Sequence, residues 1–217
     1  MLKKLTEQIN HHKKMKNTIS TIPGYHLNEY LVVLTPHEEL RQKIMHLKKE
    51  FSEKYEAKVS MGLKPHLAIL RFSQLEMMEE RIINRLHSIA MGFPPFKIEL
   101  NGYGSFPSHT IYVQVATKIP VQLLQKQLKG FQRLLKPDND HKPHFMEEPH
   151  IAIARKLLPW QYEKGWLEYQ HRHFSGKFIA DGMLLLKRKE GEKNYQAIQR
   201  FEFENLPVNT RQGELFF

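Results

Sequence analysis

Cysteine is absent from this sequence of 217 residues, so disulfide bonds and thiolate catalysis are excluded. Long hydrophobic runs are missing too: stretches such as Tyr30 to Leu34 are much shorter than the roughly 20 apolar residues of a membrane-spanning helix. Lys3 and Lys4 are followed by no apolar block, which argues against a secretion signal. These absences predict a cytoplasmic protein with no membrane partner.

A glycine-rich phosphate loop of the nucleoside-triphosphatase kind is also missing, which argues against ATP-driven chemistry, and we expect no cofactor. Histidines and carboxylates do gather between residues 138 and 148, but their spacing fits no template for a metal site. Because Pro137, Pro143 and Pro149 surround them, we interpret this stretch as a flexible loop and expect no metal. A metal-binding protein that uses the loop is the weakest hypothesis.

Positive charge dominates the composition. The sequence has 33 Lys and Arg residues against 23 Asp and Glu, a formal net charge of +10, and such a field attracts phosphate esters or nucleic acid. Part of the excess lies in a basic arm or helix expected over residues 1–25, where lysines oppose only Glu7. We expect this arm to be solvated, residues 26–204 to form the folded domain, and residues 205–217 to form a tail. A monomer is favoured.

Two halves of the domain repeat one pattern at an offset of 84 residues. One helix is expected after Thr35 and Pro36 and another from Pro120, and each has one apolar face. The four apolar positions of the first helix recur in the second without a gap; they are Leu40, Ile44, Leu47 and Phe51, then Leu124, Leu128, Phe131 and Leu135. A constant offset that covers helix start, helix face and the following strand indicates a duplication.

The remaining elements complete the predicted fold class. Strands are expected near residues 29–34, 64–71, 96–100, 110–115, 177–186 and 195–203, and further helices over 73–91 and 159–170. We assign Trp160 and Trp166 to the buried face of the last helix, and residues 101–108 to a turn-rich connection. The pattern predicts an α+β protein that duplicates a β-α-β-α-β unit. Two lobes, at about residues 26–105 and 106–204, would line a central cleft with antiparallel-rich sheets and carry the helices outside.

One short phrase occurs in both halves. PHLAIL begins at Pro65 and PHIAIA at Pro149, again 84 residues apart. Side chains alternate along a strand, so in each copy the histidine and the alanine share the face opposite the aliphatic core. These pairs are His66 with Ala68, and His150 with Ala152. Matched positions in two similar lobes point toward a shared cleft, which makes the histidines candidate functional residues.

Paired imidazoles suit acid–base chemistry, because an ordinary pKa near 6.5 lets one ring accept a proton while the other donates one. Displacement at a phosphodiester needs both roles at once. One histidine removes the proton of the attacking water or hydroxyl, and the other protonates the departing oxygen. No metal is required, and His66 and His150 are the predicted catalytic pair.

The two phrases, their spacing and the intervening GYGSFPSHTIYVQV resemble the 2H phosphoesterase superfamily, especially its 2′-5′ RNA ligase-like and cyclic phosphodiesterase branches. The resemblance covers roughly residues 29–203. It implies two lobes around a cleft and activity on 2′,3′-cyclic phosphates or on 2′-5′ linked nucleotides or RNA ends. It also implies that Arg155, five residues after the second histidine, approaches the substrate phosphate. Because simple alternation would bury Arg155, we expect the strand to end or twist there.

The sequence departs from the family pattern at two matched places. The family has threonine or serine two residues after each histidine, whereas this sequence has Ala68 and Ala152. A hydrogen bond to a charged group is worth about 1.5 to 3 kcal/mol, so each missing hydroxyl costs roughly tenfold to a hundredfold in transition-state binding. Water, backbone amides, Lys64 or Arg71 are alternative donors. A catalytically silent nucleotide- or RNA-binding module is therefore the alternative to a metal-independent phosphoesterase.

Aromatic residues near the expected turn are candidates to bind a nucleobase. Tyr103 and Phe106 can stack on a base, and hinge packing is the competing interpretation. The predicted substrate-binding residues are Arg155, Lys64, Ala68, Ala152, Arg71 and Phe106.

Overall fold

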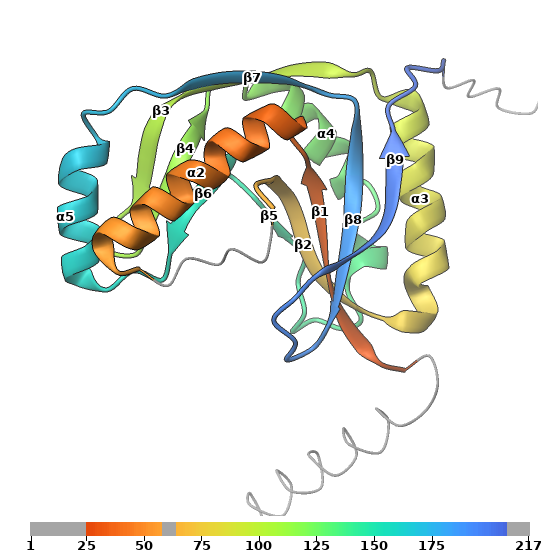
Figure 1. The fold of residues 1–217 in the computed structure, drawn as a ribbon. Helices are drawn as coiled ribbons and strands as arrows, with labels where there is room; N and C mark the ends of the chain where they lie inside the picture. Colours follow the sequence, from red (N-terminus) through yellow and green to blue (C-terminus); the bar gives the residue numbers. More distant parts are fainter. Residues whose placement is uncertain (1–24, 58–63, 208–217) are drawn as a thin grey trace, which may run out of the picture.

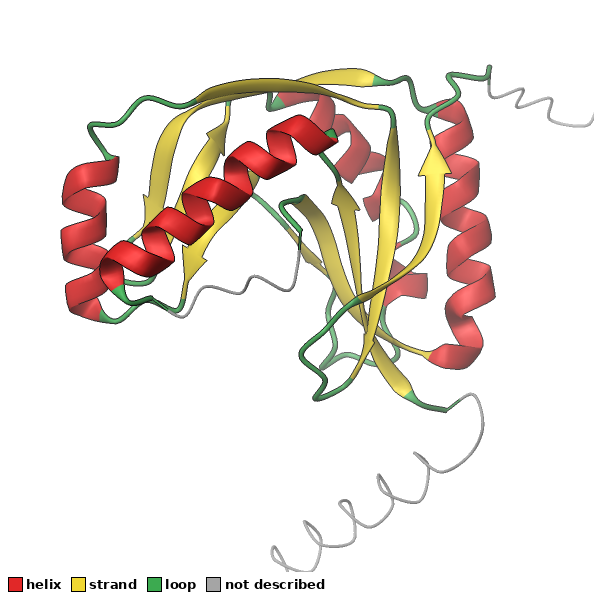
Figure 2. Ribbon diagram, in the orientation of Figure 1, coloured by secondary structure: helices red, strands yellow, loops and turns green. Residues whose placement is uncertain are grey.

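The computed structural model describes residues 25–57 and 64–207, which form nine strands and four α-helices (Figure 1). The strands make two antiparallel sheets, and the helices pack against them (Figure 2). The predicted α+β class is confirmed. The basic arm expected over residues 1–25 and most of the tail expected over 205–217 lie outside the described residues. None of the described helices combines the length and apolarity that crossing a bilayer requires.

The first sheet has the strand order β5-β2-β1-β8-β9, and all its neighbouring strands are antiparallel. Its strands are β1 (Leu27–Leu34), β2 (Leu67–Leu75), β5 (His144–Phe145), β8 (Gly182–Lys189) and β9 (Gln196–Glu202). The second sheet has the order β6-β4-β3-β7 and is antiparallel as well. Its strands are β3 (Phe96–Phe106), β4 (Thr110–Val115), β6 (His150–Arg155) and β7 (Ser175–Ala180).

Each sheet carries its own pair of helices. On the second sheet, α2 (Glu38–Tyr55) packs against β6, and α5 (Pro159–Tyr169) packs against β4 and α2. On the first sheet, α3 (Glu79–Gly92) packs against β9, and α4 (Ile119–Lys129) contacts both β2 and α3. Figure 1 shows α2 crossing the second sheet obliquely while α3 runs beside β9.

The two halves of the sequence exchange segments. β3 belongs to the first half but pairs with β4, whereas β8 belongs to the second half and pairs with β1. The helices α2 and α4 likewise pack on strands of the opposite half. The expected lobes at residues 26–105 and 106–204 therefore do not coincide with the sheets, since each sheet draws strands from both halves. Spacing along the sequence does not specify which sheet a third strand joins.

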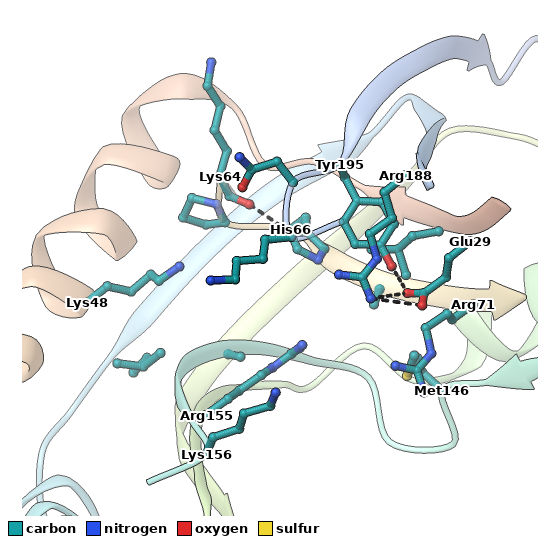
Figure 3. Close-up of a pocket in the computed structure, with 17 residues that line it drawn as sticks. Glu29, Lys48, Lys64, His66, Arg71, Met146, Arg155, Lys156, Arg188 and Tyr195 are labelled. Carbon is teal, nitrogen blue, oxygen red and sulfur yellow. Dashed lines mark hydrogen bonds and ion pairs between the residues drawn. The ribbon is translucent and has the colours of Figure 1, made fainter. Parts of the chain in front are cut away.

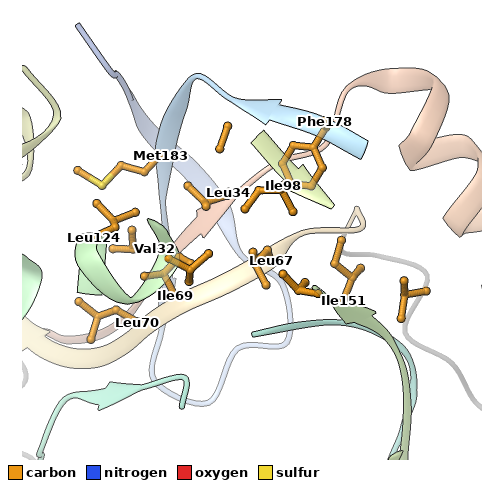
Figure 4. Packing of buried hydrophobic residues seen from close by; sticks show 14 of the residues in the cluster. Val32, Leu34, Leu67, Ile69, Leu70, Ile98, Leu124, Ile151, Phe178 and Met183 are labelled. Atoms are coloured by element: carbon orange, nitrogen blue, oxygen red, sulfur yellow. The ribbon is translucent and has the colours of Figure 1, made fainter. Parts of the chain in front are cut away.

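The apolar helix faces that define the repeat are buried. All eight positions are at most 9% exposed; they are Leu40, Ile44, Leu47, Phe51, Leu124, Leu128, Phe131 and Leu135. Full burial of one such side chain stabilises the fold by about 1.5 to 3 kcal/mol. Figure 4 shows Leu67 and Ile69 of β2 in one cluster with Ile151 of β6. Because the aliphatic face of each repeated phrase enters this core, the face with the histidine and the alanine points away from it.

Several expected boundaries differ from the structure. The helix expected from residue 73 begins at Glu79, because β2 continues through Leu75 and a 3-10 turn follows. The helix expected after Thr35 has His37 as its N-cap. The strand expected over 177–186 divides into β7 and β8, which belong to different sheets. Trp160 is 42% exposed rather than buried.

The turn expected over residues 101–108 is largely strand, since β3 continues to Phe106. Its glycines have other purposes. Gly102 has a φ of +68° within a bulge of β3, a conformation that disfavours other residues. A Cβ at position 104 would lie 2.4 Å from the Tyr112 ring, so Gly104 permits that ring to lie across β3.

Candidate active site

A cavity of about 420 Å³ lies between the two sheets (Figure 3). This volume is within the range of small-molecule sites. Among the described residues that line it, seven are Lys or Arg and one, Glu29, is a carboxylate. The seven cations are Lys48, Lys64, Arg71, Arg155, Lys156, Arg188 and Lys193. This excess of positive charge suits an anionic ligand.

His66 lines the cavity immediately before β2. Its Nδ1 lies 2.8 Å from the carbonyl oxygen of Lys64, drawn as a dashed line in Figure 3. In the neutral ring Nδ1–H donates to that carbonyl, which leaves Nε2 as the proton acceptor. The backbone thus fixes the tautomer that a general base requires.

His150 is the first residue of β6 and repeats this arrangement. Its Nδ1 lies 2.7 Å from the carbonyl oxygen of Glu148, again two residues earlier. The ring packs against Phe106 and Tyr112, with centroid separations of 5.0 Å and 4.8 Å. The close approach of Tyr112 to β3 that Gly104 permits therefore supports the position of His150.

Both histidines favour the neutral state. Burial lowers the pKa of His66 to about 4, and the positive charges of Arg155, Lys48 and His150 contribute. Burial and Arg155 also lower the pKa of His150. A bound phosphate would offset these charges and raise both pKa values, so that one imidazole can hold the proton a general acid donates.

Lys48 is a candidate that the sequence analysis missed. It is only 7% exposed and reaches the cavity from the apolar face of α2. Burial and the charge of Arg155 lower its pKa to about 8. The signal was present in the sequence, since Lys48 follows Ile44 by four residues and precedes Phe51 by three, which places a lysine on an otherwise apolar stripe.

Arg155 reaches the cavity because β6 is irregular, as expected. In the pairing of β6 with β4, Ile153 is an extra residue between Ala152 and Ala154. Such a bulge shifts the alternation by one, so Arg155 joins the face of Ala152, and β6 ends there. Desolvation by the cavity walls and the charge of Arg71 lower the pKa of Arg155, although the side chain keeps much of its surface exposed.

Arg71 is the counterpart of Arg155 in the first half, 84 residues earlier, an equivalence that the sequence analysis did not recognise. The same irregularity occurs in β2, where Ile69 is the extra residue between Ala68 and Leu70 in the pairing with β1. The bulge again turns the arginine toward the cavity. The two halves therefore contribute a matched histidine, alanine and arginine each.

Glu29, Arg188 and Tyr195 form an ordered group at one end of the cavity in Figure 3. Arg188 donates to both carboxylate oxygens of Glu29, at 2.8 Å and 2.9 Å, and the Tyr195 hydroxyl also donates to Glu29. The guanidinium of Arg188 lies 4.6 Å from the centroid of the Tyr195 ring. Burial alone would raise the pKa of Glu29, but these hydrogen bonds and the nearby arginines lower it. No local sequence signal joins three residues so far apart.

The matched alanines both line the cavity. Ala68 is 6% exposed and packs in a small apolar cluster with Leu31, Val33 and Leu186. Ala152 is partly exposed. Neither side chain donates a hydrogen bond, so the donors at this place are the basic side chains around them.

The cavity brings together six of the eight predicted site residues: Lys64, His66, Ala68, Arg71, Ala152 and Arg155. His150 lies behind the lining, against Phe106 and Tyr112, and its charge contributes to the pKa of His66. Phe106 does not line the cavity, because it lies in β3 with its ring against His150. Tyr103 packs against Tyr169 and Phe174, consistent with the packing interpretation.

The histidine-rich stretch is partly ordered by pairing rather than a loop throughout. β5 pairs with β2, and Nδ1 of His141 lies 2.8 Å from the Asp138 carboxylate. Within residues 25–57 and 64–207, no three His, Asp or Glu side chains are arranged to hold a metal ion.

Two antiparallel sheets with a repeated histidine facing a shared cationic cavity define a protein of the 2H phosphoesterase kind. A model of the family described as the 2'-5' RNA ligase superfamily matches residues 29–192, so the chain belongs to that superfamily. The resemblance drawn from the repeated phrases is thereby confirmed. A search of the curated proteins finds no match.

Solved structures share the fold at low identity. E. coli LigT complexed with 3'-AMP has a TM-score of 0.63 and 13% identity, covering 82% of this chain and 98% of LigT. TT0787 of Thermus thermophilus has a TM-score of 0.55 and 18% identity, covering 81% and 98%. A protein described as a phosphoesterase has a TM-score of 0.59 and 13% identity, with the same coverage as TT0787. Further LigT structures are complexes with phosphate, ATP and NADP+.

Proposed function

We propose that this protein is a metal-independent phosphoesterase that acts on 2′,3′-cyclic phosphates or 2′-5′ linkages of nucleotides or RNA ends. The observation that carries the proposal is the matched pair of imidazoles, His66 and His150. Each has its Nδ1 held by the carbonyl oxygen two residues earlier, beside one cationic cavity. The nucleotide and phosphate complexes of LigT are consistent with such a ligand.

The two histidines divide the proton transfers of a hydrolysis. His66, whose pKa is the more strongly anchored by burial, accepts the proton of the attacking water at Nε2. The water oxygen bonds to phosphorus as the bond to the departing ribose oxygen breaks. His150, protonated in the presence of the anionic substrate, donates its proton to that oxygen. With roles exchanged, the same groups catalyse the formation of a 2′-5′ bond.

Lys48 and Arg155 supply the phosphate contacts that Ala68 and Ala152 lack. Both cations line the cavity, and their charges act on His66 more than any other fixed charge nearby. A cation desolvated beside a phosphate stabilises the charge that develops on its oxygens in the transition state. This arrangement replaces two neutral hydroxyl donors with two charged ones.

The experiment that tests the proposal measures hydrolysis of 2′,3′-cyclic AMP in excess chelator. We expect turnover by the wild type, and a loss of at least about a hundredfold in kcat for His66→Ala and for His150→Ala. His87→Ala, which changes an exposed histidine of α3, is the matched control. Loss of activity in chelator, or full activity of either site variant, would refute the mechanism.

The alanines at positions 68 and 152 specifically favour a second candidate, a nucleotide- or RNA-binding module without turnover. It shares the cavity and the positive field but performs no chemistry. Nucleotide binding by isothermal titration calorimetry combined with no detectable hydrolysis on cyclic and 2′-5′ linked substrates would establish this function instead.

A further inference from the structure

The cavity holds more positive charge than one phosphate can balance. Seven Lys and Arg side chains line it against one carboxylate, so the described lining carries six net positive charges with neutral histidines. A cyclic phosphate or a phosphodiester carries a single negative charge. Like charges brought together in a partly desolvated space repel, and the arrangement becomes favourable when an anion of matching charge binds.

The charges fall into two groups along the cavity. At the catalytic end, the charges that act on His66 belong to Lys48, Arg155 and His150. At the outer end lie Glu29, Arg188 and Tyr195, whose mutual hydrogen bonds largely neutralise one another. Figure 3 shows Lys48 and this outer group on opposite sides of Arg155.

Arg71 belongs to the outer end. Its charge acts on Glu29 and Tyr195, and Figure 3 places its guanidinium beside Met146. Glu29 accepts its hydrogen bonds from Arg188 and Tyr195, and Arg71 makes no side-chain hydrogen bond or ion pair with another residue of the described ranges. Lys193, on the loop between β8 and β9, adds a further exposed cation to this end of the lining.

We propose that Arg71, assisted by Lys193, forms a second phosphate subsite, so that the ligand is a nucleotide with a phosphate at its 5′ position besides the reacting phosphate at its 2′ and 3′ oxygens. This inference rests on the proposed function for the identity of the catalytic end. Arg71 thus differs in role from its counterpart Arg155, because the Glu29 group occupies one end of the cavity and the histidines the other. The 5′ phosphate belongs either to a free nucleotide or to the chain of an RNA 3′ end.

Calorimetric Kd values for three adenosine ligands test the subsite without requiring turnover. The ligands are adenosine 3′-monophosphate, adenosine 3′,5′-bisphosphate, and a diadenosine with a 3′-terminal phosphate. We expect the bisphosphate to bind at least about tenfold more tightly than the monophosphate, as one additional charged hydrogen bond provides. Arg71→Gln should reduce this ratio to about twofold or less. Lys126→Gln removes one exposed charge of α4 outside the cavity and should leave the ratio unchanged.

Each outcome decides the proposal. Equal affinities of the wild type for mono- and bisphosphate, no detectable binding of either, or a ratio unaffected by Arg71→Gln would overturn the subsite. If Arg71→Gln weakens both ligands by the same factor, both arginines hold one phosphate and the proposal fails. Tight binding of the diadenosine supports the subsite and identifies an RNA end, whereas tight binding of the bisphosphate alone supports it and identifies a free nucleotide. Absence of cyclic AMP hydrolysis refutes the proposed function and leaves these Kd ratios as a separate result.

Discussion

His66 and His150 hold their imidazole rings in the same way: each Nδ1 lies within 2.8 Å of the carbonyl oxygen two residues earlier in the chain. The backbone of each repeated phrase therefore presents Nε2 as the working nitrogen. A matched tautomer at two repeat-related positions is the geometry that exchange of acid and base roles requires, because either ring can then accept or donate through the same atom.

Restoring a hydroxyl beside one histidine should increase activity. Ala152 is the better position, because it is partly exposed in the cavity while Ala68 is packed among aliphatic side chains. We expect Ala152→Thr to have a kcat/KM about tenfold above that of Ala152→Val on 2′,3′-cyclic AMP, since the two side chains differ mainly in the hydroxyl. Equal rates for threonine and valine would show that the charged donors already saturate the phosphate contacts.

Lys48 should contribute to catalysis at the expense of stability. Lys48→Met should lower kcat/KM by about tenfold to a hundredfold, and Lys48→Arg should retain most of the activity. The same Lys48→Met change should raise the free energy of unfolding, by up to about 3 kcal/mol, because it removes a buried charge whose pKa is lowered to about 8. Steady-state kinetics and urea denaturation measure the two effects. A methionine variant that keeps full activity would contradict this role.

Stability should fall in acid because of His66. Its folded-state pKa of about 4 lies below the unfolded value near 6.5, so the unfolded chain binds the proton first as the pH decreases. The stability present above pH about 6.5 is therefore lost as the pH falls toward 4, by about 2 to 3 kcal/mol. His66→Gln should flatten this dependence in urea denaturation, and His87→Gln, at an exposed position, should not. An unchanged slope in His66→Gln would refute the buried neutral state.

Much of the fold followed from the repeat. The offset of 84 residues identified both apolar helix faces and both histidine strands, because burial of a regular stripe leaves a period in the sequence. The exchange of β3 and β8 between the sheets was not predictable, since pairing partners are chosen by long-range packing. The strand through Phe106 was missed because glycines that permit a bulge and the approach of Tyr112 look like turn residues.

The candidate site divides in the same way. Histidines and alanines were found by repetition, and Arg71 could have been paired with Arg155 by the same offset. Lys48 was detectable as a lysine on an apolar helix stripe. The group of Glu29, Arg188 and Tyr195 was not, because residues separated by more than 150 positions meet only through the pairing of β1 with β8.

The central claim, that two imidazoles act on one phosphate, is tested most directly by a double-mutant cycle on hydrolysis of 2′,3′-cyclic AMP. The kcat/KM values of His66→Ala, His150→Ala and the double variant are compared with the wild type. If both rings serve a single displacement, each single change lowers kcat/KM by at least about a hundredfold and the double variant is little worse than either one. A double variant whose loss equals the product of the two single losses, or a single variant near wild-type activity, would contradict the account.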